Sequence, residues 1–270
     1  MLTEEQRRQF ASDGYVLVPG VVDDALLRAA DAEVDALVAA TPPPPAIVGP
    51  HFHFLPPARL PAAHAALRHS GALDLADELV APHHLDHAFD HIQVALNIRP
   101  YPHRPGAPHI DGHRPGEEIG SFTMLAAVFL GDESTPDRGN LWMWPGSHRG
   151  HAELFRDRGV EVLKSVSGHA IMLQPPAWFG PGQPLLARRG DLLLAHFLLG
   201  HNIGGNTSAD TRRILYYRLA ADGHPGRWAD TFRDPFTEYP SLRDIAPVEP
   251  VAPDPPNRRP QTGSLDTSMS

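Results

Sequence analysis

The sequence predicts a mainly β protein built on a double-stranded β-helix, the jelly-roll or cupin-like barrel, with helices packed on it near the N-terminus. From residue 89 onward, short apolar runs alternate with turns rich in Gly, Pro and Asp, which is typical of sandwiches and barrels. Apolar residues at helical spacing occur before residue 82. Of the 270 residues, 41% are hydrophobic and 20% charged, which fits a folded, soluble chain. We expect one domain over residues 1–245.

Helices are expected in three places before residue 82. Thr3 and Gln6 form a capping-box pattern, so "TEEQRRQFASDG" predicts a short helix that Gly14 stops. The apolar spacing within 23–40 predicts a second helix, which ends before "TPPPP". A third helical pattern covers about 60–81, and "YVLVP" after the first helix predicts a strand.

The later strands are expected in six apolar runs, and the chain end is different in character. The runs are "FDHIQVALNI", "SFTMLAAVFL", "NLWMW", "AIMLQ", "DLLLAHFLL" and "RRILYYRL". Residues 246–270 are rich in proline and polar residues, so a disordered tail is predicted there.

Composition and charge exclude several classes of function. The chain has no cysteine, so disulfides, zinc–thiolate fingers and thiol nucleophiles are excluded and a cytoplasmic location is favoured. The net charge is -9 and no basic run occurs, so nucleic acid is not an expected partner. The start lacks an apolar leader region and no stretch approaches a membrane span, so no membrane partner is expected either. The sequence does not define the oligomeric state.

A candidate metal site begins in "PHIDGH", at the exit of a loop broken by Pro and Gly. On an extended strand, residues i and i+2 point to the same face, so His109 and Asp111 would project together. An imidazole and a carboxylate are two of the three protein ligands of a 2-His-1-carboxylate Fe(II) site. His113 extends the alternation, but we expect it to serve as an outer hydrogen-bonding group.

His201 is the candidate third ligand, since it lies where the apolar strand 192–200 ends. In a jelly roll, His201 can face His109 and Asp111 inside the mouth of the barrel. This triad leaves three positions open on Fe(II), of which a keto acid can fill two and dioxygen one. The far carboxylate of a keto acid needs a fixed cation, and an arginine such as Arg212 on the following strand suits that role.

These motifs resemble the phytanoyl-CoA dioxygenase family of Fe(II)- and 2-oxoglutarate-dependent oxygenases. The resemblance rests on "PHIDGH", "GNLWMWPGSH", His201 with Asn206 and Arg212, and the opening "LTEEQRRQFASDGYVLVPGVV", and it covers roughly residues 1–220. It implies that His109, Asp111 and His201 bind iron. It also implies that Arg212, rather than Arg213, binds the tail of 2-oxoglutarate, with dioxygen as the second cosubstrate.

Further cosubstrate contacts follow from the same resemblance. Members related to ectoine hydroxylase hold 2-oxoglutarate with a Gln-x-x-x-Asn strand, which "QVALN" matches and which implicates Gln93 and Asn97. Thr123 is a candidate from its position in the next strand. The chain departs from family patterns at Ile110 and Ile203, so phytanoyl-CoA is not implied as the substrate. Related halogenases lack the ligand carboxylate, and the presence of Asp111 therefore favours hydroxylation.

Competing residues have ordinary interpretations. A second H-x-D at 84–86 follows a helix and reads as surface polar residues, and His196 is expected to be a buried strand histidine on the opposite face from His201. Ser147 is expected to cap a helix after "PG". The segments 51–61 and 174–184 are candidate substrate lids.

The predicted function is hydroxylation of an unactivated C–H bond of a small metabolite, as in natural-product tailoring. Two alternatives remain at this point. A cupin-like metal enzyme that does not use 2-oxoglutarate would keep the three ligands without needing Arg212, and a catalytically silent jelly-roll binding protein would need none of them.

Overall fold

A large antiparallel sheet of seven strands dominates the computed structural model, which describes residues 1–111, 120–165, 172–173 and 179–245. Its strands run in the order β1-β10-β6-β12-β4-β2, and β3 pairs with the C-terminal end of β12. Their bounds are β1 Tyr15–Val18, β2 Gly49–Leu55, β3 Leu85–Asp86, β4 Ile92–Ile98, β6 Met124–Phe129, β10 Leu192–His196 and β12 Arg212–Ala221. Strand β2 lies at one edge of this sheet.

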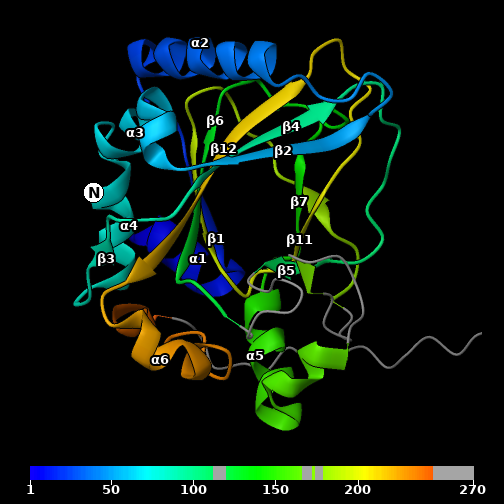
Figure 1. The fold of residues 1–270 in the computed structure, drawn as a ribbon. Coiled ribbons are helices and arrows are strands. Elements are labelled where there is room, and N and C mark those ends of the chain that lie inside the picture. The colour runs from blue at the N-terminus through cyan, green and yellow to red at the C-terminus, as the bar shows by residue number, and fades with distance from the viewer. Residues whose placement is uncertain (112–119, 166–171, 174–178, 246–270) are drawn as a thin grey trace, which may run out of the picture.

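Two smaller sheets complete the β structure. One has the order β11-β7-β9 and the other pairs β5 with β8, all antiparallel. Their bounds are β5 Ile110–Asp111, β7 Leu141–Met143, β8 Met172–Leu173, β9 Gln183–Pro184 and β11 His201–Ile203. Figure 1 shows β5, β7 and β11 on the side of the large sheet away from α3 and α4.

Helices cover the other side of the large sheet. Figure 1 shows α2, α3 and α4 along this side, with α5 and α6 at the lower end of the molecule. The helices are α1 Glu4–Asp13, α2 Asp24–Ala40, α3 Pro61–Arg68, α4 Ala72–Val80, α5 Ser147–Arg158 and α6 His224–Thr231, with 3-10 turns η1 Pro57–Arg59, η2 Val160–Ser165 and η3 Pro240–Leu242. None of the helices in the described part of the chain is long and apolar enough to cross a bilayer.

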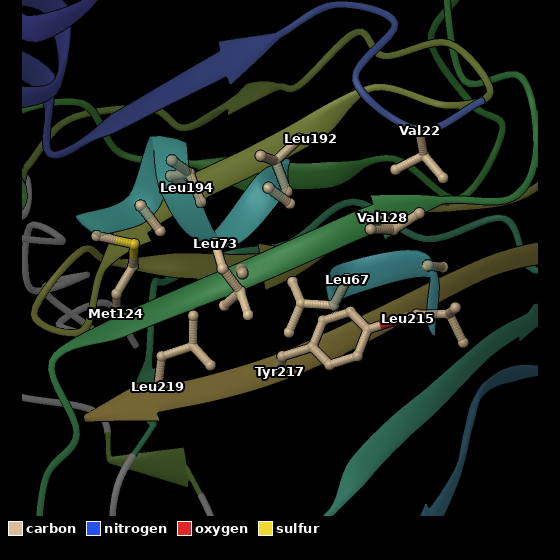
Figure 2. Close-up of a cluster of buried hydrophobic side chains, with 14 of the residues drawn as sticks. Val22, Leu67, Leu73, Met124, Val128, Leu192, Leu194, Leu215, Tyr217 and Leu219 are labelled. Carbon is tan, nitrogen blue, oxygen red and sulfur yellow. The ribbon is translucent and has the colours of Figure 1, made fainter. Parts of the chain in front are cut away.

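Two apolar clusters lie on the two faces of the large sheet. The outer cluster packs the helices on the sheet, and Figure 2 shows Leu67 and Leu73 from the helices against side chains of β6, β10 and β12. The inner cluster fills the space between the large and small sheets, with residues such as Ala127, Ile214 and Met143. Strand alternation explains this division, because neighbouring residues of one strand face opposite clusters: Leu215 lies in the outer one and Ile214 in the inner one.

The predicted start of the chain is confirmed in detail. The Thr3 hydroxyl accepts a hydrogen bond from the Gln6 backbone amide, the Thr3 backbone amide donates one to Gln6 Oε1, and Gly14 ends α1 at φ 81°. The second helix begins at the Asp23 cap and ends at Ala40, as expected.

Three local expectations are corrected. The helix predicted over 60–81 is two helices, because Gly71 adopts φ 82° between α3 and α4. Of the candidate lid 51–61, residues 51–55 belong to the edge strand β2, and the rest contains the turn η1 and the first residue of α3. Ser147 is the first residue of α5 and does not cap it; its hydroxyl instead accepts a hydrogen bond from the Gly200 amide at 2.8 Å.

The remaining expectations fall partly or wholly on other segments. The tail at 246–270, His113 and residues 174–178 of the second lid lie outside the described residues. The strand expected in "AIMLQ" is described at Met172–Leu173 alone.

Candidate metal centre and cosubstrate site

The backbone brings His109 and His201 together across two strands. The His109 amide donates to the His201 carbonyl at 2.9 Å, and the His201 amide donates to the His109 carbonyl at 3.0 Å. Such a reciprocal pair places the two residues directly opposite each other. Their imidazole centroids are consequently 4.4 Å apart, although the residues are far apart in sequence.

Asp111 completes a group of three possible metal ligands. Its Oδ1 lies 3.6 Å from His109 Nε2 and 3.7 Å from His201 Nε2. One ligand atom from each of the three residues lies within 4.8 Å of the others, so the group could hold a metal ion. The described residues contain no other such cluster of three or more His, Asp or Glu side chains. The i, i+2 alternation thus places His109 and Asp111 together, as expected.

The protonation states of the three side chains suit a metal ligand set. Burial is the largest cause that lowers the pKa of His109 to about 3, and the nearby His201 is the second cause. The His109 imidazole is therefore neutral near pH 7. His201 Nδ1 donates to the Leu199 carbonyl at 2.9 Å, which leaves the Nε2 lone pair for a metal. Burial alone would raise the pKa of Asp111, but Arg218 and His201 hold it well below the ordinary value, so the carboxylate is ionised.

Arg218 is part of the site although the sequence did not single it out. Its Nη2 donates to Asp111 Oδ2, and its Nη1 donates to Gln93 Oε1 at 2.8 Å. The signal was present in the sequence, because Arg218 lies an even number of positions after Arg212 on one strand and therefore shares its face. Arg218 fixes the Asp111 oxygen that does not approach the histidines, as outer partners of metal ligands commonly do.

Arg212 lies on the inner face of β12, as expected, whereas Arg213 lies on the outer face beside Asp35 at 2.7 Å. The Arg212 side chain is fully buried, and its Nε donates to Glu133 Oε1 at 3.2 Å while its Nη2 donates to the Tyr216 hydroxyl at 2.8 Å. Its Nη1 has no hydrogen-bond partner among the described residues. A buried guanidinium with a spare donor is a suitable receptor for a carboxylate.

Asn97 lies directly opposite Arg212 in the register of β4 and β12. Its Nδ2 donates to the Gly204 carbonyl at 2.9 Å, and its Oδ1 has no partner in the part of the chain that is described. A Cβ at Gly139 would touch the side chains of both Asn97 and Arg212, which shows that the two are neighbours. Gln93, on the same face of β4, lines the cavity in front of the ligand group.

Thr123 lies elsewhere. Its hydroxyl donates to Glu238 Oε2 at 2.5 Å and accepts from the Ala221 amide at 2.7 Å. It does not line the cavity, and its partners belong to a buried network near the C-terminal end of the described chain. The structure thus gives Thr123 a set of partners that does not include the metal ligands.

A cavity of about 330 Å³ opens in front of the three ligands. His109, Asp111 and His201 line it together with Gln93 and Arg218. Tyr216 also lines it and separates it from Arg212, which lies behind. His196 is buried away from the cavity with its Nε2 on the Pro235 carbonyl at 2.8 Å, and His84 is exposed, so neither competes as a ligand.

Solved structures share this architecture. HygX from Streptomyces hygroscopicus, with nickel and 2-oxoglutarate bound, aligns with a TM-score of 0.54 and 20% identity over 82% of this chain and 88% of its own. The non-heme alpha ketoglutarate dependent carbocyclase SnoK from nogalamycin biosynthesis aligns with a TM-score of 0.58 and 21% identity, over 84% of this chain and 90% of its own. The epimerase SnoN from nogalamycin biosynthesis aligns with a TM-score of 0.54 and 23% identity, over 80% of this chain and 82% of its own. At these identities the likeness establishes the fold, and it confirms the jelly-roll core that the sequence predicts.

The sequence itself establishes the family. The family model of phytanoyl-CoA dioxygenase matches residues 10–214, while a search of curated proteins gives no significant match. The fold and the family match together define an iron- and 2-oxoglutarate-dependent oxygenase. The chain belongs to the phytanoyl-CoA dioxygenase family.

Proposed function

We propose that this oxygenase hydroxylates an unactivated C–H bond of a small metabolite, and that His109, Asp111 and His201 hold its Fe(II). The observation that carries the proposal is the buried two-histidine, one-carboxylate group at the base of an open cavity. Fe(II) with 2-oxoglutarate and dioxygen supplies the oxidising power for C–H chemistry. The cytoplasmic location that the sequence favours stays a prediction.

The protein side chains have separate tasks in this proposal. His201 is held in the correct tautomer by the Leu199 carbonyl, and Asp111 is oriented by Arg218. The inner cluster packs apolar side chains such as Ile110 beside the ligand group, while the cavity admits the substrate.

We assign the tail carboxylate of 2-oxoglutarate to Arg212 with support from Asn97, and a further polar contact to Gln93. The free Nη1 of Arg212 supports this assignment, because it can donate to the carboxylate. The unpartnered Asn97 oxygen can accept from a water molecule that also donates to the carboxylate. Since Tyr216 lies between Arg212 and the cavity, its hydroxyl must turn or share the same carboxylate when the cosubstrate binds.

The matched pair Arg212→Ala and Arg213→Ala tests the assignment. Loss of a charge-assisted contact worth about 2 kcal/mol or more should weaken 2-oxoglutarate binding at least ~30-fold in the first variant. The second variant removes a neighbouring arginine from the outer face and should bind 2-oxoglutarate as the wild type does. Anaerobic titration with Fe(II) and 2-oxoglutarate, followed by the visible charge-transfer band of the chelate, measures both affinities.

The other outcomes of that titration select the alternatives. A wild-type protein that binds Fe(II) but turns over independently of 2-oxoglutarate would be a cupin-like metal enzyme of another kind. A wild-type protein that gives no band would be a silent binding protein.

The type of reaction needs a separate measurement, because structural neighbours include a carbocyclase and an epimerase. Candidate metabolites are screened for substrate-dependent succinate formation, and the product is then made under ¹⁸O₂. Hydroxylation predicts one ¹⁸O atom in the product. A product without ¹⁸O would instead support ring closure, desaturation or epimerisation.

A further inference from the structure

The mouth of the cavity carries two phenyl rings that the fold leaves exposed. Phe52 is 37% and Phe54 is 40% exposed, although phenylalanine is usually buried. Both lie on the edge strand β2 and line the cavity. In the register of β2 and β4, Phe52 is opposite Ala95 and Phe54 is opposite Gln93, so both rings face the inner side of the barrel.

A second pair of rings stands at the cavity and is held rigidly. Tyr101 and His103 stack with centroids 5.0 Å apart and planes at 23°, and both line the cavity. The Tyr101 backbone pairs reciprocally with Asn206 at 2.7 and 2.8 Å. Gly49 permits the close approach of Tyr101 to β2, because a Cβ there would lie 2.9 Å from the ring. The Tyr101 and His103 rings are therefore in place before any substrate binds.

The charges of the cavity disfavour a cationic substrate. Among the described residues that line it, Asp111 is the one carboxylate, and it already contacts Arg218 and lies beside both histidines. Aromatic rings can also attract cations, but a cation in this cavity would meet the Arg218 guanidinium without a carboxylate left to neutralise it. Leu141 and Ile203 line the cavity too and offer apolar contact.

We propose that the substrate is a neutral molecule with a fused aromatic ring system, which stacks on Phe52 and Phe54 and presents its reacting carbon to the ligand group. This inference rests on the proposed function for its chemistry and names the substrate class of the same site. Flat rings suit the cavity because offset and edge-to-face ring contacts add to the gain from apolar burial. A cavity of about 330 Å³ lies at the small end of ligand pockets, so it accommodates few rings at one time.

Three probes of similar size test the substrate class: 2-naphthol, its saturated analogue decahydro-2-naphthol, and the ammonium compound 2-naphthylmethylamine. Binding to the anaerobic protein with Fe(II) and 2-oxoglutarate is measured by calorimetry at pH 7. We expect 2-naphthol to bind at least 10-fold more tightly than either of the others. Equal affinity for the saturated probe, or tighter binding of the ammonium probe, overturns the inference.

Variants at Phe54 and Phe52 locate the binding. Phe54→Leu keeps an apolar side chain and removes the ring, so it should weaken 2-naphthol about 5-fold or more and leave decahydro-2-naphthol within 2-fold. Leu186→Ala is the control, because Leu186 is 47% exposed and lies outside the cavity lining. Unaltered 2-naphthol affinity in both Phe54→Leu and Phe52→Leu would contradict the proposed stacking.

The same samples separate this inference from the proposed function. The charge-transfer band of the Fe(II) chelate is recorded before each probe is added. A normal band without selectivity for 2-naphthol rejects the aromatic substrate class alone. An absent band with ring-selective, Phe54-dependent binding rejects the oxygenase chemistry and retains the aromatic site.

Discussion

Glu133 shares one buried ion pair with Arg212, and this pairing should make cosubstrate binding depend on pH. Burial raises the pKa of Glu133 to about 7 even though Arg212 acts in the opposite direction, with Asp132 and Arg138 as the other nearby charges. A second carboxylate on Arg212 would repel ionised Glu133, so 2-oxoglutarate should bind the protein in which Glu133 is protonated. That form becomes scarcer by about tenfold per pH unit above 7.

Glu133→Gln should therefore remove the pH dependence. We expect the wild-type dissociation constant of 2-oxoglutarate to rise between pH 7 and 8.5, and that of the variant to stay nearly constant. The control is Glu153→Gln on α5, which should follow the wild type. Charge-transfer titrations at pH 6, 7, 8 and 8.5 give the four constants per protein, and parallel slopes in wild type and Glu133→Gln would contradict the linkage.

At the scale of single residues, the sequence was sufficient where a local pattern decides side-chain direction. Alternation on a strand placed His109 beside Asp111, and it separated Arg212 from Arg213. It was insufficient where a partner comes from elsewhere in the fold. Glu133 approaches Arg212 from the segment after β6, and no local pattern in "GDES" indicates a buried carboxylate.

At the scale of elements, a buried polar network fastens the segment that contains α6 and η3 to the large sheet. The Glu238 carboxylate accepts from the Thr123 hydroxyl and from Arg227, and contacts His224 Nδ1 at 3.0 Å. His224 Nε2 in turn donates to the Ser121 carbonyl at 2.9 Å. The imidazole thus links the start of β6 to the C-terminal segment.

Glu238→Ala should destabilise the protein by about 3 kcal/mol, because it leaves buried donors and a histidine without their anionic partner. Arg243→Ala is the control. It removes an exposed ion pair with Asp234 and should cost less than about 1 kcal/mol. Urea unfolding at pH 7 measures both free energies, and equal midpoints for the two variants would contradict the role of the network.

Helix and strand predictions succeeded where caps and periodicity agree, as in α1 and α2. They failed at Gly71, because a single glycine in a helical pattern is compatible with either a continuous helix or a break. The sequence "HFHFLPP" alternates as a strand should, yet its apolar, proline-rich composition suggested a substrate lid. Only the neighbouring strand β4 and the cavity explain why this edge strand carries two partly exposed phenyl rings on its inner face.

For the molecule as a whole, three buried histidines outside the ligand group predict loss of stability in mild acid. Burial is the first cause that lowers the pKa of His151 and of His196 to about 4, and it holds that of His148 well below the ordinary value. The unfolded chain binds protons on all three near pH 6.5, whereas the folded chain does not until lower pH. Stability should therefore fall as pH drops from 6.5, by about 2 kcal/mol at pH 5 for each of His151 and His196, and His148 should add to the loss.

Urea unfolding at pH 7.5 and pH 5 with a chelator present measures this loss. Glu133 acts with the opposite sign between its ordinary pKa and about 7, but one carboxyl does not outweigh three histidines. His196→Gln should show a smaller difference between the two pH values by about 2 kcal/mol. Exchange of the exposed His84 for Gln should leave the difference unaltered, and equal wild-type stability at both pH values would contradict the prediction.

The jelly roll could be predicted at this scale because the rhythm of apolar runs and the motif order point to the same fold. The order of strands in the sheet could not. Strand β1 pairs with β10, and β12 lies between β6 and β4, so neighbours in space come from distant parts of the chain. Register between such strands depends on packing of both faces of the sheet, which no single segment of sequence records.

His109 and His201 hold each other through amide and carbonyl atoms, and their imidazoles take no part in that contact. Chemistry and scaffold are thereby separated at the same two positions. We therefore expect the backbone pairing to persist when either side chain is exchanged for another metal ligand, so that new ligand sets could be engineered at this centre.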